Sequence, residues 1–311
     1  MDYNSFYSDK IVSSCYLIEG EDDFLKNLAV KKIKNDYNIE ELDCSEFHEE
    51  INVPLIQSSL EVVPFFSEKR VVVVNEYYPK AKEVKELEAI FSNDKNSSIL
   101  IICNKNKCEA LKSINLCFVD CNKSETFLVK HVLELFKNSN LKIEKNTVNS
   151  IIDFCSCDAF KVDSECNKLI GFCLENGIVT LKDVENLVNK DLDYKVYELT
   201  EYIAKKQHQK AYEIIEDMLN KGESEHKIFV SIYNYFKRLF YCRLNSDLFD
   251  LVDVLGIKEY AVKKAIESSK RFTAVSLQQI TKKFSEYDFN VKSGKISIKN
   301  ALWLSIFQIG L

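Results

Sequence analysis

Residues 15–26 read CYLIEGEDDFLK, an apolar run that passes through Gly20 into the start of a helical pattern. A strand that enters a helix through a glycine is the geometry in which backbone N–H groups and a helix N-terminus bind phosphate. In this chain three acidic residues, Glu21, Asp22 and Asp23, stand where phosphate would bind. The stretch therefore predicts a nucleotide-binding type of fold whose phosphate site has the wrong charge.

Further apolar runs of strand length follow over the next hundred residues. In the run RVVVV at 70–74 the four residues after Arg70 are apolar without a break, as in a strand that is covered on both faces. Stretches with helical spacing separate the runs, and this alternation favours a parallel sheet flanked by helices. Strands are predicted at 14–20, 39–45, 70–74, 97–104 and 115–121, the second being the weakest, and helices at 24–37, 54–63 and 84–91.

Beyond residue 122 the sequence reads as one amphipathic helix after another. Thr180 and Asp183 have the spacing of a capping box, and Gly222 marks a helix end. The predicted fold class is therefore α/β plus all-α, in three parts: a parallel-sheet domain at 1–122, a small helical domain at 123–191 and a larger helical domain at 192–311.

The composition limits the classes of partner. The 311 residues have a net charge of −6, which argues against a protein whose affinity comes mainly from neutralising phosphates. Residues 192–311 carry 19 basic and 15 acidic side chains, a weak indication of nearby nucleic acid. No apolar run approaches a membrane span and the start lacks an export signal, so we expect a cytoplasmic protein with no membrane partner and 11 reduced cysteines.

The residues that nucleotide chemistry requires are missing from the predicted sheet. After Gly20 there is no second glycine and no Lys-Ser/Thr pair of a P-loop. The strand VVVVNE ends with Asn75 where an aspartate would hold Mg²⁺, and an amide cannot supply that charge. Asn104 is of the type that senses a γ-phosphate in related ATPases, but taken alone it is better explained as a loop residue that ends a strand. We expect no cofactor and no catalytic residues.

A metal site is an alternative that the cysteines raise. Cys103, Cys108, Cys117 and Cys121 could be imagined as a zinc cluster, but their spacing lacks the tight C-x₂-C turns of such sites. Cys117 and Cys121 fall on one face of a predicted strand, which favours packing in a core. The four histidines are scattered and suggest no nucleophilic site.

An apolar stretch in LEVVPFFSEKRVVVV is the strongest candidate for a binding site. Val63, Phe65 and Phe66 lie just before the buried strand, and Pro64 stiffens the backbone between them. Two adjacent aromatic residues at an element boundary could plug the core of the sheet itself. If exposed, they have the form of an interface hot spot. The pattern alone does not decide between these two roles.

Five motifs are spread over the chain. In chain order they are YLIEGEDDFL, VVPFFSEKRVVVV, VYELTEYIAKKQHQKAYEIIEDMLNKGES, LGIKEYAVKKAIESSKRF and DFNVKSGK. Each motif is moderately specific, but together, in this order and spacing, they extend over nearly the full length of the chain. The set resembles the delta subunit family of the bacterial DNA polymerase III clamp loader.

The resemblance implies an AAA+-like fold that does not bind ATP: a RecA-like domain, a small lid domain and a helical collar domain. It also implies that Phe65 and Phe66, with Val63 beside them, insert into a pocket of the ring-shaped sliding clamp (beta) and open the ring. The implied partners are the gamma/tau ATPase subunits and delta-prime in a hetero-pentamer, and primed DNA through the assembled complex. The sequence departs from the family in having Phe-Phe where Leu-Phe is frequent, next to a proline.

Two other functions remain open at this point. An active AAA+ ATPase subunit of the same architecture would bind Mg-ATP with micromolar affinity. A DNA-binding adaptor would use the weakly basic residues 192–311, with LGIKEYAVKKAI as an imitation of a helix-turn-helix.

Overall fold

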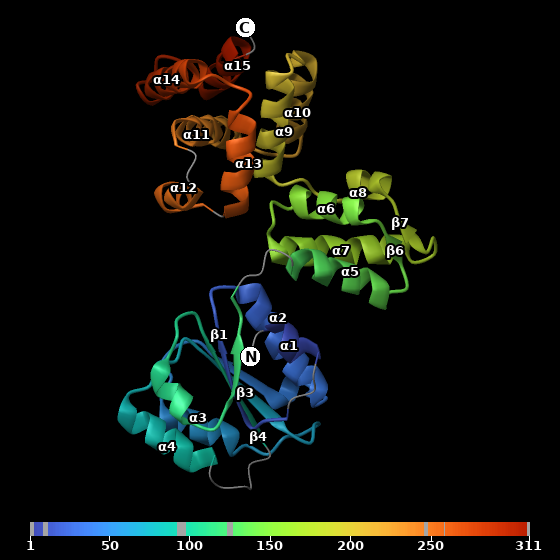
Figure 1. The fold of residues 1–311 in the computed structure, drawn as a ribbon, viewed down its shortest axis with the longest axis vertical. Coiled ribbons are helices and arrows are strands. Elements are labelled where there is room, and N and C mark those ends of the chain that lie inside the picture. The colour runs from blue at the N-terminus through green and yellow to red at the C-terminus, as the bar shows by residue number, and fades with distance from the viewer. Residues whose placement is uncertain are drawn as a thin grey trace. The chain divides into compact units, whose positions relative to one another are not determined.

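A parallel β-sheet flanked by helices forms the N-terminal part of the chain (Figure 1). The computed structural model describes residues 3–8, 12–91, 98–122, 127–245, 248–257 and 259–309. The elements of this part are α1 Tyr3–Ser8, β1 Cys15–Glu19, α2 Asp23–Asp36, the 3₁₀ helix η1 Glu41–Asp43, β2 Cys44–Phe47, α3 Val53–Leu60, β3 Arg70–Asn75, α4 Ala81–Phe91, β4 Ser98–Asn104, the 3₁₀ helix η2 Glu109–Ser113 and β5 Cys117–Asp120.

The strands lie in the order β2-β3-β4-β1-β5, and every pairing is parallel. Alternate residues of each strand enter different hydrophobic clusters. On β1, Cys15 and Leu17 pack with residues of α3 and α4, whereas Tyr16 and Ile18 pack with residues of α1 and α2. Because both faces are covered, the inner strands are apolar without interruption. The prediction of a parallel sheet between two helical layers is confirmed.

The rest of the chain is helical. Contacts between residues divide the chain into two units, Met1–Phe127 and Leu128–Leu311. The elements after the sheet are α5 Phe127–Asn138, β6 Lys142–Ile143, α6 Lys145–Phe154, α7 Ala159–Cys173, β7 Ile178–Val179, α8 Leu181–Leu187, α9 Leu192–Ala204, α10 His208–Asn220, α11 Glu225–Leu244, α12 Leu248–Leu255, α13 Glu259–Ser269, α14 Ala274–Lys292 and α15 Ile298–Ile309.

The second unit contains two separate hydrophobic clusters. One is built from α5 to α8 and the other from α9 to α15. The predicted helix signals are confirmed, since Thr180 and Asp183 form a capping box and Gly222 follows α10 with φ +87°. Within the described ranges, no helix is long and apolar enough to cross a membrane.

Three details differ from the sequence predictions. The second strand begins only at Cys44, because residues 41–43 form η1. The short parallel pair β6-β7 was not predicted, since two residues are too few to show a strand period. The helix predicted at 54–63 ends at Leu60. Ser97, which the predictions included in a strand, lies outside the described residues, as do residues 123–126 at the start of the predicted small helical domain.

Candidate functional site

The loop between α3 and β3, residues 61–69, carries the most exposed aromatic pair of the sheet unit. The side chains of Val63, Phe65 and Phe66 are 80%, 83% and 61% exposed. The two rings contact each other edge to face, with centroids 4.8 Å apart. The alternative that these phenylalanines plug the core of the sheet is therefore wrong for this structure.

A buried carboxylate holds the backbone of the aromatic pair. Asp43, the last residue of η1, accepts hydrogen bonds from the backbone N–H groups of Phe65, Phe66 and Ser67 at 2.5, 2.7 and 2.6 Å. The Ser67 hydroxyl in turn accepts the backbone N–H of Glu40 at 2.9 Å. Two segments more than twenty residues apart in sequence are thus joined by four hydrogen bonds.

These contacts also define the charge state of Asp43. Burial raises the pKa of this carboxyl, but the three N–H groups and the Ser67 hydroxyl outweigh burial and lower the pKa from 3.8 to about 2. Asp43 is therefore ionised at neutral pH, and a carboxylate accepts hydrogen bonds through both oxygens. A charged, buried acceptor fixes the loop from beneath while the two rings stay in solvent.

Both ends of the loop are also fixed. Helix α3 starts where the Asn52 side chain accepts the backbone N–H of Leu55, and it ends at the buried Leu60. The Leu60 carbonyl accepts the buried Ser98 hydroxyl at 2.6 Å, which ties the helix end to β4. The loop then enters β3 at Arg70. The backbone of the loop is therefore fixed where it follows α3, where it enters β3, and at residues 65–67, which Asp43 binds.

The glycine of the opening motif has a packing role. Gly20 has φ +150°, and a Cβ at this position would lie 2.4 Å from the carbonyl carbon and oxygen of Cys121. Its N–H donates to the Asn104 carbonyl. The close approach of the chain after β5 therefore requires glycine here without reference to a phosphate.

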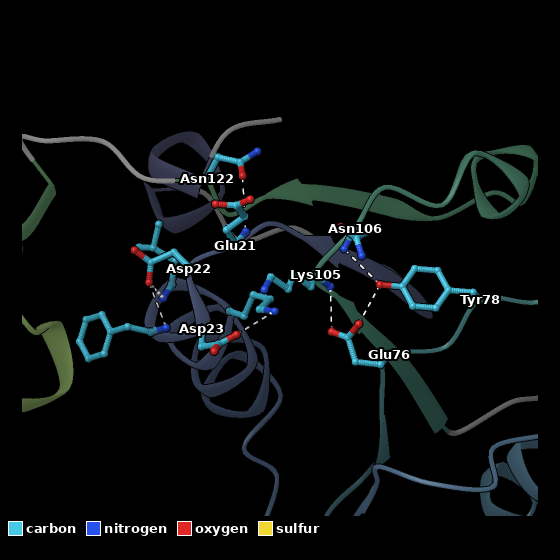
Figure 2. Close-up of polar contacts among 11 residues, drawn as sticks. Glu21, Asp22, Asp23, Glu76, Tyr78, Lys105, Asn106 and Asn122 are labelled. Atoms are coloured by element: carbon cyan, nitrogen blue, oxygen red, sulfur yellow. Dashed lines mark hydrogen bonds and ion pairs between the residues drawn. The ribbon is translucent and has the colours of Figure 1, made fainter. Parts of the chain in front are cut away.

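Two of the three acidic side chains after Gly20, those of Asp22 and Asp23, make internal contacts at the start of α2 (Figure 2). Asp22 is the N-cap of α2 and accepts the backbone N–H groups of Phe24 and Leu25. Asp23 forms an ion pair with Lys26 at 2.9 Å. Glu21 differs from these two, because its backbone N–H donates to the Asn122 side chain at 3.5 Å and its carboxylate lies at an exposed position.

Lys26 was not singled out from the sequence, although a signal was present. It lies six residues after Gly20, the distance that separates the first glycine and the lysine of a P-loop. In the structure Lys26 is only 8% exposed and its ammonium group pairs with Asp23. Asp22 therefore accepts N–H groups at the start of α2, and Asp23 balances the charge of Lys26. Neither contact requires an external anion.

The other predicted nucleotide residues also make internal contacts. The Asn75 amide donates to Glu46 on β2, which is the strand on the far side from β1. Asn104, the last residue of β4, is buried. Its side chain accepts the backbone N–H of Tyr77 and donates to the Tyr77 carbonyl, so it ties the end of β4 to the loop that follows β3. Glu76, the residue after Asn75, accepts hydrogen bonds from the Tyr78 hydroxyl and from the backbone N–H of Lys105. Figure 2 shows these three residues together.

The imagined zinc cluster does not form. Cys103 and Cys121 lie in the hydrophobic cluster beneath α1 and α2, and Cys117 packs against it. Cys108 lies in the cluster on the opposite face of the sheet. No group of three or more metal-ligating side chains is found among the residues that the structure describes. Burial raises the pKa of the Cys103 thiol to about 12, as expected for a packing role.

The aromatic loop could be identified from the sequence, but its anchor could not. Val63, Phe65 and Phe66 stand out because they are apolar residues in a connection. Asp43 contacts this loop from 22 to 24 residues away, and the motif LDCS around it has no feature of a capping or turn signal for that loop. Only the pairing of β2 with β3 brings the two segments together.

Comparisons with known proteins agree with this architecture. The family model "DNA polymerase III, delta subunit" matches residues 16–130, and the model "DNA polymerase III delta subunit, C-terminal domain" matches residues 193–309. The chain is similar to the DNA polymerase III subunit delta of Bacillus subtilis, with 22% identity over 96% of this chain and 93% of the relative. It is also similar to a probable subunit delta of Aquifex aeolicus, with 21% identity over 85% and 81%.

The fold is shared with a solved structure. The Bacillus subtilis DNA clamp loader delta protein superposes with a TM-score of 0.74 and 20% identity, over 96% of both chains. The two family models fall on the sheet unit and on the last helical cluster, which are the parts in which the motifs of the sequence lie. From these matches and the fold, the chain belongs to the DNA polymerase III delta subunit family.

Proposed function

We propose that this chain binds the ring-shaped sliding clamp (beta) through Phe65 and Phe66, with Val63 beside them, and opens the ring for loading onto primed DNA. The observation that carries the proposal is an exposed aromatic pair on a backbone that Asp43 holds rigid. An interface hot spot needs large apolar side chains that reach a pocket on the partner. Because the loop is ordered before binding, little conformational entropy is lost on association.

The energy for opening comes from binding in this proposal. A loop that binds an open or strained ring more tightly than a closed one shifts the equilibrium between them by its differential affinity, and by no more. The chain itself supplies no nucleotide chemistry, because Asp22 and Asp23 occupy the groups that would hold phosphate. We infer that gamma/tau ATPase subunits, which assemble with this chain and delta-prime, control when the pair can reach the clamp.

We also infer a three-part organisation, with domain boundaries near residues 122 and 191. Two separate hydrophobic clusters within the helical unit support the second boundary, since one cluster is made of α5 to α8 and the other of α9 to α15. The second cluster would be the core of a collar domain that joins the neighbouring subunits. The first boundary adjoins residues 123–126, which lie outside the described chain.

The affinity of the purified chain for its cognate clamp tests the binding proposal. We expect the double substitution Phe65→Ala and Phe66→Ala to weaken binding by at least about 100-fold, from about 2 kcal/mol or more for each hot-spot residue. The matched control replaces Phe160 and Phe172, which are 50% and 59% exposed on α7. Binding of the Phe65/Phe66 variant at the strength of the control would overturn the proposal.

A further inference from the structure

Exposed apolar side chains of the sheet unit gather on two neighbouring segments. Among the residues that the structure describes there, eight large apolar side chains are exposed, and five of them lie on η1 or on the loop 61–69. Single apolar residues scattered on a surface need no explanation, but a concentration of this kind marks an interaction surface. The five are Leu42, Val62, Val63, Phe65 and Phe66; the other three are Tyr7, Val12 and Tyr78.

Leu42 is the member of this group that the aromatic loop does not contain. Its side chain is 73% exposed on η1, although its neighbour Asp43 is fully buried. Asp43 contacts the Phe65 N–H at 2.5 Å. Covalent geometry then places the Leu42 Cα within about 10 Å of the Phe65 nitrogen, counting about 3.8 Å between adjacent Cα atoms and the reach of an aspartate side chain. This distance is well within the span of one protein interface of ordinary size.

Acidic side chains surround this apolar group. Glu40 and Glu41 directly precede Leu42 in sequence, and Glu61 and Glu68 lie on either side of the apolar residues of the loop; all four are exposed. An apolar centre with a charged rim is the usual anatomy of a protein interface. A partner surface complementary to this one would have an apolar pocket with basic residues at its edge, and such charges raise the rate of association.

We propose that η1 forms the second half of the clamp-binding surface and that Leu42 contacts the clamp beside the pocket that receives Phe65 and Phe66. This inference rests on the proposed function, because it assigns Leu42 to the same partner. The four hydrogen bonds that join η1 to the loop keep the two halves in a fixed relation. A rigid surface with two apolar contact points binds the clamp in one orientation, which a single flexible aromatic pair would not define.

The test compares Leu42→Ser with Leu174→Ser, an equally simple change at a leucine that is 58% exposed in the other unit. With purified cognate clamp, we expect Leu42→Ser to weaken binding about 5- to 30-fold, the result of removing one leucine from an interface. Leu174→Ser should stay within about twofold of the wild type. Amide hydrogen exchange at residues 65–67 should be unchanged in Leu42→Ser, which shows that the Asp43 anchor is intact.

Failure of this inference can be told apart from failure of the proposed function. If Leu42→Ser binds like the wild type while the variant lacking both Phe65 and Phe66 does not bind, the Leu42 contact is wrong and clamp binding stands. If the phenylalanine variant binds normally, the proposed function is wrong, and with it the inference. A loss of binding in Leu42→Ser that is accompanied by faster exchange at residues 65–67 also overturns the contact, because the anchor would then be the cause.

Discussion

The Asp43 carboxylate accepts the backbone N–H of Phe66 at 2.7 Å, so a buried charge on η1 holds the backbone of a residue whose ring is 61% exposed. The same carboxylate binds the N–H groups of Phe65 and Ser67. One side chain, that of Asp43, therefore fixes the backbone of the loop, while the two phenylalanine rings remain exposed. We infer that Asp43 positions the residues for which we propose clamp binding.

The substitution Asp43→Asn tests that positioning role. The asparagine side chain keeps one acceptor oxygen but replaces the other with an NH₂ group, which is a donor. The backbone N–H groups of residues 65–67 are also donors, so at least one of their three hydrogen bonds to residue 43 is lost. We expect amide exchange at residues 65–67 to accelerate at least about tenfold and clamp affinity to fall at least about fivefold. Exchange in the buried strand 71–74 serves as the control, since global destabilisation would accelerate it equally.

The contribution of Asp43 should also depend on pH. Its pKa is about 2 in the folded chain and 3.8 is the ordinary value, so the unfolded chain takes up the proton first as pH falls. The stabilisation is fully present above about pH 5 and is lost as pH falls from about 4 to about 2. We expect the difference in Tm between wild type and Asp43→Asn to be constant at neutral pH and to shrink over that acidic range. A difference that stays constant down to about pH 2 would contradict the assignment.

Gly20 and Gly171 give a matched pair for the packing explanation of the opening motif. Gly20→Ala places a Cβ 2.4 Å from the Cys121 carbonyl at φ +150°, and we expect a loss of about 2–5 kcal/mol in the free energy of unfolding. Gly171 lies within α7, where an added Cβ would meet no atom within 4 Å, so Gly171→Ala should be neutral or stabilising by up to about 1 kcal/mol. Denaturant unfolding measures both; equal effects would contradict this explanation.

Calorimetry with Mg-ATP tests the silent nucleotide site. Asp22 caps α2 and Asp23 pairs with Lys26. A triphosphate would therefore have to displace both carboxylates, and their negative charge would repel it. We expect no binding heat at micromolar to millimolar nucleotide. Micromolar affinity would instead favour the alternative of an active ATPase subunit and would contradict the assignment of these acids.

Much of the fold could be predicted because its signals are local. The uninterrupted apolar runs at 71–74 and near residue 100, the capping box at Thr180 and the glycine after α10 each depend on neighbouring residues in the sequence. The two-residue strands β6 and β7 could not be predicted, because their pairing joins segments about 35 residues apart and leaves no period to detect.

The candidate site was predicted less completely for the same reason. Phe65 and Phe66 could be selected by residue type, but their exposure depends on what covers the loop, which the sequence does not state. The role of Asp43 arises only when β2 pairs with β3. The spacing of Lys26 after Gly20 matches that of a P-loop lysine and could have been noticed in the sequence. Its ion pair with Asp23 instead results from the three-residue spacing of the two side chains within one helical turn.

Ring opening is the most direct test of the central claim. A fluorescent donor and acceptor placed across one subunit interface of the cognate clamp report the distance between the two edges. If the chain binds the open ring more tightly, as we propose, addition of the wild-type chain at saturating concentration should lower energy transfer. The variant lacking Phe65 and Phe66 should leave energy transfer unchanged, whereas the Phe160/Phe172 control should act like the wild type. Equal opening by all three proteins would contradict the account.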